Sequence, residues 1–143
     1  MMPFKLKIVT ADGVFFDGEA ERLNVRTSTG DIGIMARHIN YVAPLGMGCA
    51  VVITGGQRRT AACIGGMVTV MNGEVTLVPT TFEWAEDIDV ARAEAAYQKA
   101  SRVVAENTCE ADVRLAQAKL SRALVRKGVA RYRIDIDPAS IAQ

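Results

Sequence analysis

Residues 67–78 read MVTVMNGEVTLV, with the pair Asn72-Gly73 between two apolar-rich runs, Val68–Met71 and Glu74–Val78. Asparagine and glycine both tolerate the positive φ angles that a two-residue hairpin turn requires. This stretch therefore predicts a β-hairpin, with its turn at Asn72 and Gly73.

The same pattern extends toward the N-terminus. The runs Val51–Ile53 and Arg59–Ile64 flank Gly55 and Gly56, which predicts a second tight hairpin. Two earlier stretches alternate with the two-residue period of strands that bury one face; their expected inward residues are Phe4, Leu6, Ile8, Leu23, Val25 and Thr27. Turns every 8–12 residues favour an antiparallel β-sandwich or barrel.

After Pro79 the pattern changes from strand to helix. Residues 88–106 contain no glycine or proline, and Asp87 is expected to cap this helix, with Asp89 close to its positive end. The pattern breaks at 107–109 and resumes over 110–126, and Gly128 is expected to stop the second helix. An αα-hairpin with two roughly equal arms is predicted.

The apolar stripes of these two arms consist of small residues. They are Ala93, Ala96, Ala100 and Val103 on the first arm, and Val113, Ala116, Leu120 and Leu124 on the second. A buried leucine contributes roughly 1.5–3 kcal/mol and an alanine much less, so such a hairpin is marginal by itself. Two interpretations remain open: a mobile element, or a firmly docked C-terminal hairpin.

The chain has 143 residues, 50% of them hydrophobic and 23% charged, with a net charge of +1. This length suits one compact domain with a small appendage, and the near-neutral charge argues against a general nucleic-acid binder. Residues 74–94 are strongly acidic, whereas residues 113–133 carry seven basic residues and no acid. The basic stretch is either a face for an acidic partner or anion, or a solvated helix face.

Cysteines and apolar runs indicate the compartment. The three cysteines include no CxxC pair, which argues against a disulfide scaffold and favours a reducing compartment; His38 and the scattered thiols do not suit a zinc site. The N-terminus lacks the apolar core of a signal peptide, and the apolar run Cys49–Ile53 is too short to cross a bilayer. Any association with a membrane is expected to go through partners.

No catalytic motif is found in the sequence. There is no P-loop, and Gly65-Gly66 does not have the spacing of a dinucleotide fingerprint. His38 has no serine elbow nearby, and the acids Glu83, Glu86 and Asp87 are interpreted as capping and solvating a helix start. An unrecognised small enzyme is therefore the disfavoured alternative.

Four segments, in order along the chain, resemble the ATP synthase epsilon family. They are 8–13 with 16–19, 29–35 followed by His38 and 42–45, 64–68 with 75–77, and 85–93. In one loop the sequence departs from the family, whose members usually carry proline and glycine just before the histidine and proline two residues after it. Those places are occupied by Ala36, Arg37 and Asn40.

The resemblance implies a β-sandwich of about ten strands over residues 1–86, an αα-hairpin over 87–131 and a tail over 132–143. It implies a non-catalytic rotor subunit of the bacterial F-type enzyme, peripheral on the cytoplasmic face of the membrane, whose sandwich contacts the gamma subunit and the c-ring. Residues 29–34 resemble the ring-facing loop, with Asp31 at its tip and His38 nearby as a partner contact; an ordinary hairpin turn is the alternative.

The resemblance also implies a regulatory hairpin. Extended, its basic second helix would meet acidic segments of the alpha and beta catalytic subunits and restrain ATP hydrolysis. No cofactor is required, but some family members bind ATP in the folded state, and Asp89, Arg92, Arg122 and Arg126 match their pattern, with Lys99 where an arginine is usual. A stand-alone ATP sensor is the alternative function.

Overall fold

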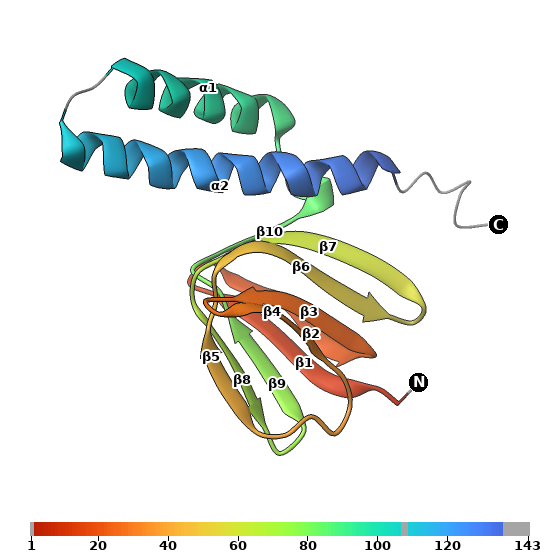
Figure 1. Ribbon diagram of the computed structural model, residues 1–143. Coiled ribbons are helices and arrows are strands. Elements are labelled where there is room, and N and C mark those ends of the chain that lie inside the picture. The colour runs from red at the N-terminus through yellow and green to blue at the C-terminus, as the bar shows by residue number, and fades with distance from the viewer. Residues whose placement is uncertain (1, 107–108, 136–143) are drawn as a thin grey trace. The chain divides into compact units, whose positions relative to one another are not determined.

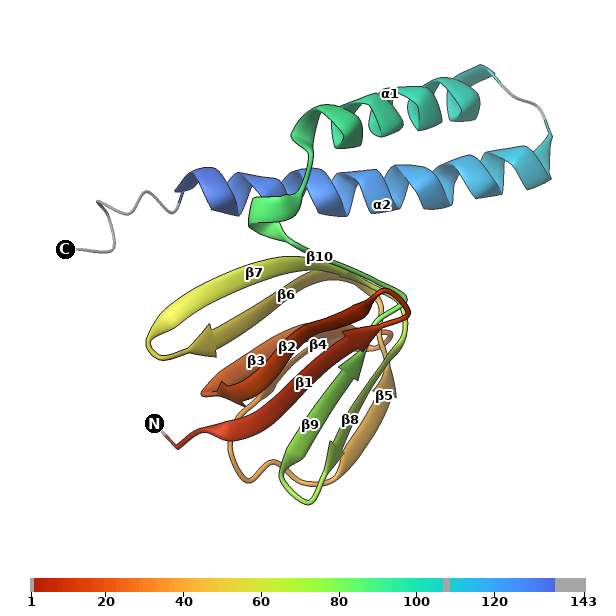
Figure 2. The same ribbon diagram turned by 180° about the vertical axis from the view of Figure 1, so that it is seen from behind.

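The computed structural model of the chain describes residues 2–106 and 109–135 (Figures 1 and 2). The chain divides into two compact units, Met1–Trp84 and Ala85–Gln143. The first unit contains all the β-strands and the second contains the helices. The expected tail over 132–143 lies mostly outside the described residues, and α2 includes its first four positions.

The first unit is a sandwich of ten strands in two five-stranded sheets, which confirms the predicted fold. One sheet has the order β2-β1-β9-β8-β5 and the other β10-β7-β6-β3-β4 (Figure 1). The strands are β1 Phe4–Thr10, β2 Gly13–Ala20, β3 Arg22–Thr27, β4 Gly30–Ile34, β5 Tyr41–Pro44, β6 Met47–Thr54, β7 Gln57–Ile64, β8 Met67–Met71, β9 Glu74–Val78 and β10 Thr81–Trp84.

The N-terminal strand inserts between β2 and β9, and its pairing with β9 is parallel whereas the other strand pairs are antiparallel. Lys5 lies opposite Glu74 in this register, and the two side chains form an ion pair at 3.7 Å. Both side chains are largely exposed, so the ion pair contributes little to the free energy of folding. It is consistent with the parallel register of the two strands.

Both predicted tight turns are confirmed. Asn72 and Gly73 have φ angles of 51° and 81° and join β8 to β9, and Gly55 and Gly56, at 56° and 75°, join β6 to β7. Positive φ at both central positions is the geometry that matches the right-handed twist of a hairpin.

The predicted inward residues of β1 and β3 contribute to the core from the two sheets. Phe4, Leu6 and Ile8 are buried, and so are Leu23, Val25 and Thr27. Residues from both sheets join them in one apolar cluster, which also includes Ile34, Val52, Val68, Val70, Leu77, Phe82 and Trp84.

The pair Gly65-Gly66 connects the two sheets, because β7 belongs to one sheet and β8 to the other. Gly66 has a φ of 93°, and a Cβ at this position would lie 2.0 Å from the carbonyl oxygen of Val78. Only a residue without a side chain fits this close backbone approach.

The second unit is the predicted helical hairpin, preceded by the short 3₁₀ turn η1 (Ala85–Asp87). Helix α1 (Val90–Glu106) has 17 residues and α2 (Glu110–Asp135) has 26, so the prediction of equal arms is wrong. Gly128 does not stop α2. Glycine costs a helix interior only about 1 kcal/mol, and the next two residues, Val129 and Ala130, are buried, which favours continuation.

The cap of α1 is Asp89 and not Asp87. Asp89 Oδ1 accepts a hydrogen bond from the backbone N–H of Arg92 at 3.1 Å, and its carbonyl accepts from Ala93 N–H at 3.0 Å. Asp87 lies within η1, two residues before Asp89 and too early in the chain to cap α1.

The seam between the helices is made of alanines. Ala93 and Ala100 on α1 and Ala116 and Ala123 on α2 are buried. The prediction that Leu124 lies in the seam is wrong, since it is 49% exposed. After Leu120 the next seam residue is Ala123, three positions on, and not Leu124, four positions on. The small side chain of Ala123 lets the helices approach closely.

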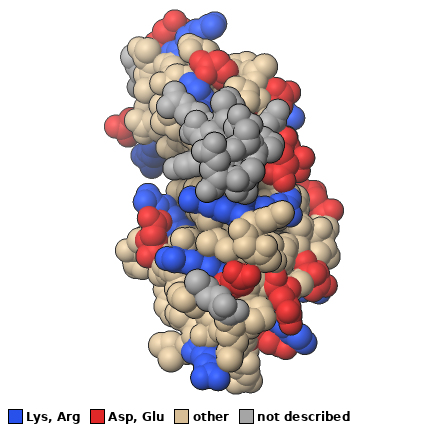
Figure 3. Space-filling model, turned by 90° about the vertical axis from the view of Figure 1, so that its right-hand side faces the viewer, with Lys and Arg blue, Asp and Glu red and all other residues tan. Residues whose placement is uncertain are grey.

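Among the described residues no helix is long and apolar enough to cross a membrane. Acidic and basic side chains are interspersed over the face visible in Figure 3, which agrees with the net charge of +1.

Candidate functional site

The segment 29–34 is not a loop with Asp31 at its tip. Gly30–Ile34 forms β4, an edge strand paired antiparallel with β3, and the turn falls at Ser28 and Thr29. The Thr27 hydroxyl holds this turn, donating to the Gly30 carbonyl at 2.7 Å and accepting from Thr29 N–H at 3.3 Å. The ordinary hairpin is thus the arrangement observed, because local side-chain hydrogen bonds favour it.

Asp31 lies opposite Arg26 in this hairpin and forms a two-pronged ion pair with it. Arg26 Nε donates to Asp31 Oδ1 at 3.0 Å and Arg26 Nη2 donates to Oδ2 at 3.3 Å. The hydrogen bond from Arg26 lowers the pKa of Asp31. Asp31 remains 68% exposed, so a partner would meet a fixed and ionised carboxylate beside its arginine.

The pair lies in a shallow polar groove on the outer face of this sheet. The groove has a volume of about 410 Å³ and also includes Arg22, Asn24 and Cys49. Arg22 Nε donates to Asn24 Oδ1 at 3.0 Å, and Gly33 and Gly48 keep the groove floor open.

His38 lies in the connection between β4 and β5 and makes local contacts. Its Nδ1 is 2.8 Å from the Ile39 carbonyl oxygen, its backbone N–H donates to Met35, and its ring meets Tyr41 edge-on at 5.9 Å. The interpretation of a loop histidine with a local hydrogen bond is confirmed.

Two of the positions that differ from the family pattern have visible consequences in this loop. Arg37 has a φ of 64°, a conformation that glycine adopts far more easily. Asn40 Oδ1 accepts a hydrogen bond from Asn72 N–H at 2.8 Å, which ties the loop to the β8–β9 turn.

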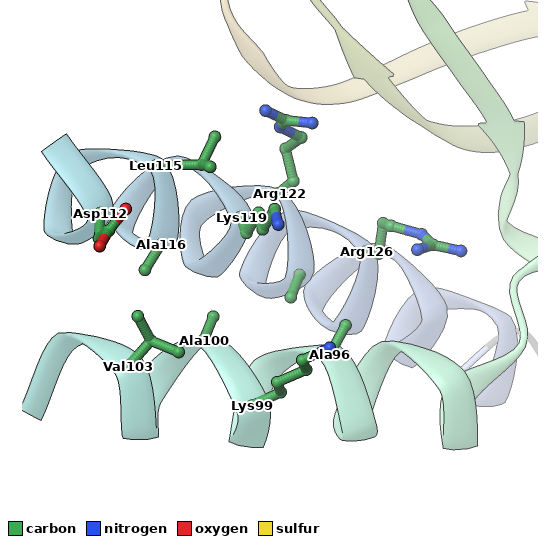
Figure 4. A pocket seen from close by; sticks show the side chains of 11 residues that line it. Ala96, Lys99, Ala100, Val103, Asp112, Leu115, Ala116, Lys119, Arg122 and Arg126 are labelled. Atoms are coloured by element: carbon green, nitrogen blue, oxygen red, sulfur yellow. The ribbon is translucent and has the colours of Figure 1, made fainter. Parts of the chain in front are cut away.

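The second candidate site is a groove of about 440 Å³ between α1 and α2 (Figure 4). Its floor is apolar, and Figure 4 shows Ala100 and Val103 on α1 facing Ala116 on α2. The groove is lined by four basic residues against one acid: Lys99, Lys119, Arg122 and Arg126, with Asp112. An apolar floor with a basic rim suits an anion that carries an apolar or aromatic body.

The structure brings together only two of the four residues that the resemblance implies for ATP binding. Arg122 and Arg126 both line the groove and extend outward from α2 in Figure 4. Asp89 and Arg92 do not line it, and the Asp89 carboxylate caps α1. Lys119 was not singled out from the sequence, although it lies one helical turn before Arg122, a spacing that could have identified it. The side chains of Arg131 and Arg133 lie outside the described part of the chain.

Cys49, Cys63 and Cys109 all lie in the described part of the chain, where they form no disulfide, and their environments differ. Burial raises the pKa of the Cys63 thiol to about 12 and also raises that of Cys49, while Cys109 is exposed. Within residues 2–106 and 109–135 no group of side chains is suited to hold a metal ion.

Both units match known protein families. Residues 3–85 match the β-sandwich domain of the ATP synthase delta/epsilon chain, and residues 86–131 match its long α-helix domain. The chain is 38% identical to the ATP synthase epsilon chain of Bacillus velezensis over 130 residues, covering 91% of this chain and 98% of the relative. It is 36% identical to that of Ruminococcus albus, covering 91% and 98%.

Two solved structures have a similar fold. A chain of the Euglena gracilis mitochondrial ATP synthase aligns with a TM-score of 0.75 at 22% identity, covering 83% of this chain and 76% of that one. A chain of the central stalk and c-ring structure of the Tetrahymena thermophila enzyme aligns at 0.64 and 13%, covering 88% and 95%. With two family domains in order and bacterial relatives matched along nearly their whole length, the chain belongs to the ATP synthase delta/epsilon family as an epsilon chain, an accessory and non-catalytic subunit.

Proposed function

We propose that this protein is a rotor subunit of the central stalk, in which the sandwich couples the gamma subunit to the c-ring and the hairpin restrains ATP hydrolysis. The observation that carries the proposal is the contrast between a sandwich with a full apolar core and a hairpin with an alanine seam. The first suits a rigid coupling element and the second an element that changes its position. The Tetrahymena structure, which contains the central stalk and c-ring, supports this placement.

We assign the coupling contacts to the sandwich. Asp31, held by Arg26 on an edge hairpin, would offer a fixed carboxylate to the ring, and the 35–40 loop with His38 would offer a second contact. A fragment of residues 1–86 should bind gamma as tightly as the whole chain in a pull-down. Loss of binding by a fragment that retains its β-sheet circular dichroism would contradict the assignment.

The brake is assigned to α2. Its cations, including Arg122 and Arg126, would meet acidic segments of the alpha and beta catalytic subunits when the hairpin extends. Removing residues 87–143 should raise ATP hydrolysis by the assembled enzyme, and replacing Arg122 and Arg126 by glutamate should act in the same direction. Equal hydrolysis rates at matched enzyme amounts would show that the chain is not inhibitory.

ATP is the ligand we propose for the folded hairpin. The basic residues Lys99, Lys119, Arg122 and Arg126 would hold phosphates over an apolar floor, and each charge-assisted hydrogen bond contributes about 1.5–3 kcal/mol. Arg92 and Asp89 would take part only if the nucleotide extends beyond the groove toward the start of α1.

Calorimetry with the isolated chain tests this binding. One ATP per chain is expected, with affinity at least tenfold weaker for Arg126→Ala. Arg114→Ala is the matched control, because Arg114 pairs with Glu110 on the same helix and does not line the groove. The absence of heat and of a thermal shift at millimolar ATP would remove the ligand and leave the rotor and brake assignments.

A stand-alone ATP sensor is the second candidate, favoured only by the same basic groove. We expect the chain on the cytoplasmic face of a bacterial membrane, held there through its partners. Affinity purification of the tagged chain from native membranes separates the two functions, since a free sensor would not recover the ATP synthase.

A further inference from the structure

We propose that three side chains, Glu94 and Tyr97 on α1 and Lys127 on α2, form a clasp that holds the two arms of the hairpin closed. Lys127 Nζ lies 2.6 Å from Glu94 Oε2 and 4.2 Å from the centre of the Tyr97 ring. One cation therefore engages a carboxylate and an aromatic face from successive turns of the opposite helix.

The carboxylate of the clasp is itself held in place. Gln98, one turn further along α1, donates from Nε2 to Glu94 Oε1 at 2.9 Å, which leaves Oε2 for Lys127. The hydrogen bond from Lys127 lowers the pKa of Glu94. The charged form of the carboxylate is thus the form that the closed hairpin favours.

Lys127 occupies a position that the seam would otherwise give to a small apolar residue. Ala123, one turn before it, and Ala130, almost one turn after it, are both buried. The Lys127 side chain is only 29% exposed, so its charge is partly removed from water and needs its partners. Since the partners are on α1, a hairpin that opens or slips in register leaves this cation without them.

A second ion pair in the hairpin differs from the clasp because both of its residues belong to one helix. Arg114 Nη2 and Glu110 Oε2 lie 3.7 Å apart, and both side chains are on α2 and largely exposed. Opening the hairpin leaves that pair intact, whereas it separates Lys127 from Glu94 and Tyr97. The clasp therefore responds to the distance between the arms.

The alanine seam makes the clasp important. Buried alanines contribute little to closure, and Leu115 and Leu124 remain about half exposed. A partly exposed ion pair and a cation–π contact together shift an equilibrium by about tenfold. In a hairpin with so small a seam, this factor sets the balance between closed and open arms.

The consequence for regulation rests on the proposed function, because it assumes that the open hairpin is the brake. Weakening the clasp would then populate the extended form and lower ATP hydrolysis. Strengthening it would keep the enzyme active in hydrolysis.

Amide hydrogen exchange of α1 in the full-length chain tests the clasp without any assumption about the brake. A separated arm frays, so exchange reports opening. Glu94→Gln is expected to raise exchange across residues 96–103 about fivefold to tenfold, while the matched control Glu110→Gln leaves it unchanged. Tyr97→Leu should act like Glu94→Gln, and Tyr97→Phe, which keeps the aromatic face, should not.

A double-mutant cycle completes the test. Lys127→Met keeps the aliphatic stem and removes the charge, and in that background Glu94→Gln should have no further effect. An equal increase with and without Lys127, or no difference between Glu94→Gln and Glu110→Gln, would overturn the clasp. Exchange that rises as expected while hydrolysis by the assembled enzyme stays constant would support the clasp and contradict the brake.

Discussion

The sandwich and the hairpin bury their apolar residues in different ways. The sandwich encloses large branched and aromatic side chains, including Ile8, Leu23 and Leu77, that are fully buried. The hairpin closes over Ala100, Ala116 and other alanines, while its leucines 115 and 124 remain about half exposed. The same chain thus contains a unit whose closure is driven by apolar burial and a unit in which apolar burial contributes much less.

Under the proposed function, this difference would let one subunit serve both as a fixed connector and as a movable element. A connector must transmit force without opening, and a dense core provides this stiffness. A brake must change its position at a small cost in free energy, so a large core between its arms would be a disadvantage. The predictions below test whether the two units differ in this way.

The largest expected effect comes from the same substitution made in both units. Leu77→Ala removes a fully buried side chain from the sandwich and should lower the free energy of unfolding by about 2–5 kcal/mol. Leu124→Ala removes an exposed side chain of α2 and should change it by less than about 0.5 kcal/mol. Chemical denaturation of the isolated chain measures both, and similar losses at the two sites would break the comparison.

The second comparison replaces one glycine by alanine in each unit. Gly128 lies inside α2, and a Cβ there would meet no atom within 4 Å, so Gly128→Ala should stabilise the hairpin by about 1 kcal/mol. Gly73 also has open space but a φ of 81°, so Gly73→Ala should destabilise the sandwich by about 1–2 kcal/mol. Thermal unfolding should show shifts of opposite sign. A destabilising Gly128→Ala would mean that the glycine serves as a hinge.

Features that depend on short-range pattern were predictable from the sequence. The turn at Asn72 and Gly73, and the inward face of Phe4, Leu6 and Ile8, follow from local φ preferences and the two-residue period. In the groove, Arg122 and Arg126 were identified from the resemblance to family members that bind ATP, and their spacing of one helical turn then places them on one face of α2.

Features that depend on tertiary approach were not predictable. Gly66 is required because its Cβ would lie 2.0 Å from the carbonyl oxygen of Val78, a residue of β9 that is distant in sequence. The choice of Ala123 over Leu124 for the seam, like the pairing of Glu94 with Lys127, depends on the register between the helices. A hydrophobic pattern on one helix does not specify that register, and Gly128 shows that a local stop signal yields to packing of the residues beyond it.

Relief of backbone strain in the 35–40 loop is expected to have a smaller effect. Arg37 has a φ of 64°, so Arg37→Gly should raise the free energy of unfolding of the sandwich by about 0.5 kcal/mol, the strain relieved less the entropy of glycine. Arg37→Ala is the control, since it removes the side chain but keeps the strain. If both variants gain equally, the side chain and not the backbone is responsible.

The last expected effect is a pH dependence confined to the hairpin. The pKa of Glu94 is lowered in the closed state by Lys127. Its stabilising contribution is therefore complete above the ordinary glutamate pKa and is lost as the pH falls through the lowered value. The pKa of Asp31 is also lowered, in this case by Arg26, so protonation of Asp31 likewise removes a stabilising contribution. Both residues belong to the edge hairpin of the sandwich, so this titration should not affect the two arms.

The measurement compares hairpin opening in the native chain and in Glu94→Gln by amide exchange from neutral pH downward, with each rate corrected for the intrinsic pH dependence. The two proteins should differ at neutral pH and converge once the pH has fallen below the lowered pKa of Glu94, because protonated Glu94 and glutamine both lack the charge that Lys127 needs. Other carboxylates titrate equally in both proteins and cancel in the comparison. A difference that persists unchanged at low pH would mean that shape or packing at position 94, and not its charge, holds the arms together.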